Sequence, residues 1–145
     1  MSSITSCLRK EHRVLESRLD ALSTAIRSGD GIAESLARAS GLAHRHYRRE
    51  QPFLDRLAMY EPALAGKLGA QHEEASEMAS RFEEALAAGQ TRDMLALARR
   101  FHAIAQHNII EEERDVFPLA DRCFTVKEQE ELVAALASLP DDSLC

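Results

Sequence analysis

Histidines and glutamates recur along the chain in a repeated order. Glu50 follows His46 by four residues, and Glu111 follows His107 by four residues. Residues four apart lie on the same face of an α-helix, one turn from each other. Imidazole and carboxylate together are typical ligands of iron, manganese and zinc. The two pairs therefore indicate two metal-binding helical turns.

A single histidine precedes each pair, His12 in the first half of the chain and His72 in the second. The two halves are offset by 60 to 61 residues. We interpret this order as one metal-binding helical hairpin that is present twice. The predicted ligands are His12 and His46 for one ion, His72 and His107 for a second ion, and Glu50 and Glu111 as bridging carboxylates.

The alternative interpretation is that the histidines are structural, because a lone histidine on an apolar helical stripe is more often a core residue than a ligand. Two carboxylates on the same inner stripes favour a metal, since a buried carboxylate is costly unless it is paired or metal-bound. Glu112 stays open as the alternative to Glu111. His44 and His102 lie about 200° and 140° around their helices from His46 and His107, so we expect them to face solvent.

The remaining sequence predicts helices that bring these residues together. The chain has 145 residues, enough for one core, and only 6 glycines and 4 prolines. We expect residues 1–145 to form a single all-α domain: an up-down-up-down four-helix bundle over about residues 5–121, with a short fifth helix over about 126–138. The predicted helix boundaries are Gly29, Pro62, Gly89, a cap at Thr91, and a capping box from Thr125 to Glu128.

Composition excludes several classes of protein. A net charge of −6 argues against a nucleic-acid-binding surface. Three cysteines without a Cys-x-x-Cys spacing argue against a disulfide framework and favour a reducing cytoplasm. The sequence has no apolar run approaching the roughly 20 residues that cross a bilayer, and its first residues do not resemble a signal peptide.

Taken together, the sequence resembles the hemerythrin-like (HHE cation-binding) domain family. The matching features are Glu11-His12, His46 with Glu50, His72, and His107 with Glu111-Glu112 running on to Val116-Phe117-Pro118. The resemblance covers the chain from about Leu8 to Asp121. It implies a non-haem centre of two iron ions bridged by carboxylates and by an oxo or hydroxo group. It also implies that the centre binds small ligands, namely oxygen, peroxide or nitric oxide. The implied roles are oxygen binding, sensing and stress response.

Oxygen-carrying members of that family have a fifth histidine one turn after the first histidine of the third helix, and Ser76 stands at that position here. We therefore expect a centre that reacts with or senses small ligands, with Tyr47 as another residue able to fill an open metal position. The alternatives are an iron- or oxygen-sensing module without turnover, an oxygen carrier or store, and a helical interaction protein with structural histidines. The sequence does not identify a redox partner.

Overall fold

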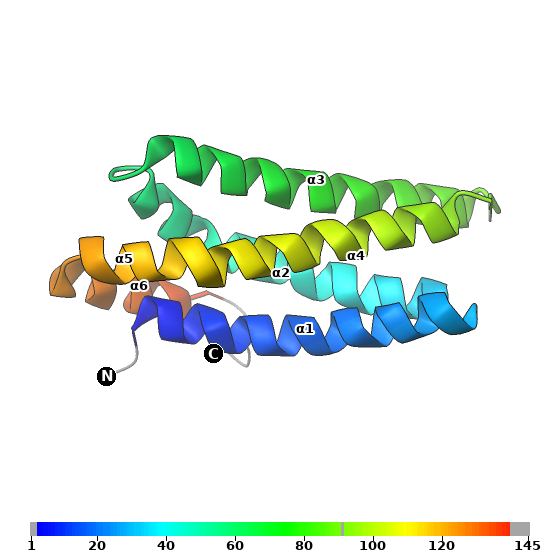
Figure 1. Cartoon of the computed structure of the whole chain (residues 1–145), viewed down its shortest axis with the longest axis horizontal. Coiled ribbons are helices and arrows are strands. Elements are labelled where there is room, and N and C mark those ends of the chain that lie inside the picture. The colour runs from blue at the N-terminus through cyan, green and yellow to red at the C-terminus, as the bar shows by residue number, and fades with distance from the viewer. Residues whose placement is uncertain (1–2, 91, 140–145) are drawn as a thin grey trace.

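The computed structural model describes residues 3–90 and 92–139. Four long helical segments lie side by side and alternate in direction (Figure 1). The elements are α1 (Ile4–Ser28), α2 (Ile32–Leu57), α3 (Pro62–Ala87), α4 (Met94–Glu111), the π-helix η1 (Glu112–Val116), α5 (Phe117–Cys123) and α6 (Val126–Ala137). The predicted all-α bundle with a short C-terminal helix is confirmed.

Most of the predicted helix ends are found in the structure. α1 ends at Gly29, whose φ of 75° places it in the left-handed region that glycine adopts most readily. Pro62 begins α3, where its missing N–H costs no hydrogen bond. Thr125 and Glu128 form the predicted capping box at the start of α6. The predicted cap at Thr91 lies outside the described residues.

The core consists of two apolar clusters with a polar layer between them. One cluster takes residues from Leu15 onward on α1 and from Ala75 onward on α3. The other takes Ile4 to Leu8 on α1 and residues up to Leu68 on α3. The stretches between them carry the buried polar side chains, which are Glu11, His12, His46, Arg49, Glu50, His72, Asn108, Glu111 and Glu112. A polar layer enclosed at both ends by apolar side chains is shielded from water.

The inner face of α4 differs from the one that the sequence predicted. Its buried side chains are Ala98, Phe101, Ala105, Asn108, Ile109 and Glu111, and the buried Glu112 follows at the start of η1. Residues 101, 105, 108 and 112 are spaced by three or four positions and therefore lie on one face of the helix, which points to the interior. His107, by contrast, is exposed, and Ile110 is 48% exposed. The predicted inward position of His107 is one residue, about 100° around the helix, from the buried Asn108.

α6 packs against one end of the bundle, beside the start of α1 (Figure 1). The amide of Ile4 donates to Gln129 Oε1 at 3.1 Å, and Arg56 of α2 pairs with Glu128 at 3.0 Å. Leu132 and Leu136 are buried in the neighbouring apolar cluster. Within the described parts of the chain, every helix is too short or too polar to span a bilayer.

Candidate metal centre

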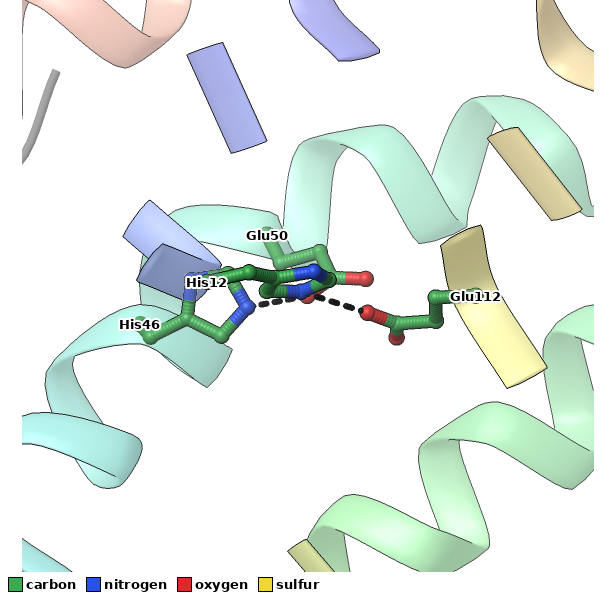
Figure 2. A group of neighbouring side chains, drawn as sticks. All are labelled: His12, His46, Glu50 and Glu112. Atoms are coloured by element: carbon green, nitrogen blue, oxygen red, sulfur yellow. Dashed lines mark ion pairs between the residues drawn. The ribbon is translucent and has the colours of Figure 1, made fainter. Parts of the chain in front are cut away.

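Four buried side chains from three segments of the bundle converge in the polar layer (Figure 2). His12 comes from α1, His46 and Glu50 from α2, and Glu112 from η1. One ligand atom from each lies within 4.8 Å of the other three. Ligand atoms bound to one ion at about 2.1 Å lie at most about 4.2 Å apart, so small shifts would bring all four to a single ion.

The facing atoms of this cluster are close but poorly aligned for hydrogen bonds. His12 Nε2 lies 3.0 Å from Glu112 Oε1, and His46 Nε2 lies 2.8 Å from Glu50 Oε2. None of these four atoms has a hydrogen-bond partner of proper geometry among the described residues. Buried polar atoms normally have such partners. Their convergence on a common point is the arrangement that a bound cation would satisfy.

The other nitrogen of each histidine ring faces a carboxylate. His46 Nδ1 lies 3.0 Å from Glu11 Oε1, and Arg49 holds the second oxygen of Glu11 at 3.2 Å. His12 Nδ1 lies 2.8 Å from Glu113 Oε2. A carboxylate on one ring nitrogen fixes the orientation and tautomer of a metal-binding histidine. Both rings are thereby set with Nε2 toward the centre.

His72 approaches the same carboxylates from α3. Its Nε2 lies 3.2 Å from Glu112 Oε2 and 4.0 Å from Glu50 Oε2. Glu112 therefore turns one oxygen toward His12 and the other toward His72. Each of the two oxygens of Glu112 thus has an imidazole nitrogen of its own as neighbour.

The charges of the site favour a mixture of protonated and ionised groups. Burial and the neighbouring Glu112 raise the pKa of Glu50. Burial alone would raise the pKa of Glu112 as well, but the neighbouring imidazoles of His12 and His72 lower it below its ordinary value. Burial opposes charge on His46, yet Glu11 and Glu50 raise its pKa to about 10. The raised pKa values of His12 and His46 favour protons on these two imidazoles beside the carboxylates, and a bound cation would take the place of those protons.

The structure brings His12, His46, Glu50 and His72 together but leaves His107 and Glu111 outside. The His107 side chain is 64% exposed, and its Nε2 lies 3.2 Å from Glu111 Oε2. Glu111 is bound by Lys67 Nζ at 2.6 Å and by Gln71 Nε2 at 2.8 Å. The inward orientation predicted for this pair is contradicted. Both residues are about 100° away from the stripe that enters the site.

Sequence reasoning kept Glu112 only as the alternative and missed its surroundings. The inner face of α4 could have been identified from the helical spacing of Phe101, Ala105, Asn108 and Glu112. Ile104 and Ile110 lie on other faces of the helix and made a different face look apolar. Asn108 occupies the inner position one turn before Glu112, and its Nδ2 donates to Gln71 Oε1 at 2.8 Å. Both histidines that were expected to face solvent lie outside the cluster: His44 is exposed, whereas His102 is half-buried.

Tyr47 borders the site on the α2 and α3 side. Its ring stacks on His72 with centroids 4.0 Å apart and planes 12° apart, and lies 5.9 Å from His46. Burial, Glu112 and Glu50 together raise the pKa of the Tyr47 hydroxyl, which therefore keeps its proton.

Comparison with known proteins agrees with this geometry. The sequence profile of the hemerythrin HHE cation-binding domain matches residues 3–137. No curated protein and no solved structure matches the chain significantly. A domain match over nearly the whole chain, with a buried cluster of histidines and carboxylates at its centre, shows that the chain belongs to the hemerythrin HHE cation-binding domain family.

Proposed function

We propose that the chain is a non-haem iron protein that binds two iron ions, bridged by an oxo or hydroxo group, and that reacts with or senses oxygen, peroxide or nitric oxide. His12 and His46 would hold one ion and His72 the other. Glu50 and Glu112 would bridge the ions. This assignment replaces the predicted Glu111 by Glu112 and removes His107.

The observation that carries the proposal is the placement of Glu112 between two sets of imidazoles. Its Oε1 lies 3.0 Å from His12 Nε2, and its Oε2 lies 3.2 Å from His72 Nε2. Glu50 Oε2 is likewise near both His46, at 2.8 Å, and His72, at 4.0 Å. Imidazole and carboxylate donors without a thiolate suit iron and manganese.

The donors present fit such ions. Five buried side chains offer neutral nitrogen and anionic oxygen atoms, and several of those atoms have no hydrogen-bond partner among the described residues. Iron bound there would supply redox chemistry and open positions for a small ligand. The protein's own contribution is to orient the rings through Glu11 and Glu113 and to enclose the site between two apolar clusters along the bundle.

The unequal supply of donors favours reaction with external ligands. The His12 and His46 side has two imidazoles, whereas the His72 side has one imidazole and the shared carboxylates. An ion on the His72 side would keep more positions for a small ligand. Ser76, one turn after His72, supplies no imidazole there.

A sensing role without turnover is the second candidate, and one observation favours it. The site residues come from α1, α2, α3 and η1, so a bound metal links all the long segments of the bundle. Because metal binding to a folded protein adds stability, iron loading would be reported as a change in the stability of the whole domain.

The experiment that separates these candidates begins with protein loaded anaerobically with ferrous iron. The proposal expects nitric oxide and peroxide to change the visible spectrum of the loaded protein, and Glu112→Gln to weaken both responses. Consumption of many equivalents of peroxide per chain would indicate turnover, and a single spectral change per chain would indicate sensing. Failure to bind iron at all would contradict both.

A further inference from the structure

Two hollows lie on the outer face between α2 and α3 and meet beside the metal centre. One has a volume of about 310 Å³ and the other about 490 Å³. Both are lined by His44, Tyr47 and Ser76, and the larger one also reaches His72. We call this continuous depression the α2–α3 groove. It connects solvent with the side of the site that has fewer protein donors.

Small residues keep the α2–α3 groove open. Gly41 lines the smaller hollow and Gly69 the larger one, and a Cβ added at either position would meet no atom within 4 Å. Ser76 stands where the hollows meet, one helical turn after His72. A longer side chain at this junction would separate the groove from the site.

A buried hydroxyl lies at the inner end of the α2–α3 groove. Tyr47 is only 7% exposed, and its hydroxyl has no hydrogen-bond partner among residues 3–90 and 92–139. A buried hydroxyl without a hydrogen-bond partner is energetically unfavourable. The stacking of the ring on His72 fixes the hydroxyl beside the centre. The hydroxyl is therefore available to donate a hydrogen bond to a ligand.

We propose that the α2–α3 groove is the entry route for small ligands and that the Tyr47 hydroxyl donates a hydrogen bond to a ligand held on the His72 side. The ligand class is a molecule or anion of two or three atoms with an acceptor atom, such as nitric oxide, peroxide or azide. Tyr47 and Ser76 line both hollows, so this route would pass between these two side chains. The inference rests on the proposed iron site and adds to it a route and a positioning residue.

The hydroxyl is tested with azide and iron-loaded protein, using Tyr47→Phe. This change keeps the stacked ring and removes only the donor. The matched control is Tyr60→Phe, because Tyr60 is the other tyrosine of the chain and donates to Glu128 instead. Loss of one hydrogen bond should weaken azide binding roughly three- to tenfold in Tyr47→Phe alone. The azide stretching frequency should shift between H₂O and D₂O in the wild type and not in Tyr47→Phe.

Three results would overturn the role of the hydroxyl. The first is equal azide affinity in Tyr47→Phe and wild type. The second is an H₂O/D₂O shift of the azide stretch that is the same in both proteins. The third is a phenolate-to-iron absorption band in the ligand-free wild type. The last result would mean that Tyr47 binds the metal itself. Each variant is first shown to hold as much iron as the wild type, so a change in affinity is not a change in loading.

The route is tested by the rate of azide association in stopped flow. Ser76→Phe and Gly69→Leu narrow the α2–α3 groove, and Ala88→Phe adds bulk to a separate hollow between α3 and α4. The rate of azide association should fall about tenfold or more in Ser76→Phe and Gly69→Leu, with little change in equilibrium affinity. In Ala88→Phe the association rate should match that of the wild type. Unchanged rates in both groove variants would exclude this route. A wild type that holds iron but binds no azide would contradict the proposed function instead.

Discussion

Glu111 and Glu112 are consecutive residues whose carboxylates lie in different surroundings. Glu112 faces His12 and His72 in the interior. Glu111 faces Lys67 on the flank of α3, where the lysine lowers its pKa. Consecutive side chains on a helix point about 100° apart. Glu112 therefore faces the site, whereas Glu111 contacts the neighbouring helix α3.

The first prediction concerns the contacts by which Glu111 holds α4 against α3. Glu111→Ala removes the contacts to Lys67 and Gln71, and we expect it to lower the free energy of unfolding by about 1 kcal/mol. The lysine is mostly exposed, so solvent screens much of the ion pair. Calorimetry should give a melting temperature about 2–4 °C lower. An unchanged melting temperature would show that this contact does not hold α3 to the end of α4.

Removal of metal should destabilise the fold. A metal at about 1,000 times its dissociation constant adds about 4 kcal/mol to the native state. We therefore expect chelation to lower the melting temperature of iron-loaded protein by roughly 10 °C. His12→Ala should remove most of this difference. His44→Ala and His107→Ala should retain it, since both side chains are exposed, and a large loss in either would contradict the assigned inner face.

Glu11 should act on the metal through His46. Glu11→Gln keeps the size of the side chain but weakens its hold on His46 Nδ1, and loss of such an orienting carboxylate typically costs about 10- to 100-fold in metal affinity. Competition with a chelator of known affinity measures the change. Asp20→Asn is the control, because Asp20 is an exposed carboxylate on the same helix. Equal affinities of the two variants would show that Glu11 does not position His46.

The fold and half of the site followed from the sequence because both depend on local patterns. Glycine at position 29, proline at 62 and the capping box at Thr125 mark helix ends by backbone chemistry alone. His12, His46 and His72 lie on helices with one clear apolar stripe. α4 has apolar side chains on several faces, and Ile109 packs inward whereas the neighbouring Ile110 is exposed. Only packing against the other helices decides which face of α4 enters the core.

The capping box of α6 should be sensitive to acid. Bonds from the Thr125 amide and from Tyr60 lower the pKa of Glu128 to about 2. The folded pKa lies below the ordinary value of about 4.5, so the ionised carboxylate stabilises the fold above that pH and this contribution is lost as the pH falls toward 2.

Melting temperatures of wild type and Glu128→Gln should therefore differ at pH 6 and converge between about pH 4.5 and pH 2. Glu130→Gln, an exposed position on the same helix, is the control and should match the wild type throughout. A difference between wild type and Glu128→Gln that stays constant with pH would contradict the ionic role of Glu128.

The most direct test of the site is the iron content of three proteins loaded anaerobically and freed of excess metal: wild type, Glu112→Gln and Glu111→Gln. Both substitutions remove one negative charge from neighbouring residues without changing side-chain size. The structure predicts about two iron ions per chain in the wild type and in Glu111→Gln, and at least one fewer in Glu112→Gln, because Glu112 is the carboxylate between His12 and His72. Full iron content in Glu112→Gln with loss in Glu111→Gln would contradict the assigned centre.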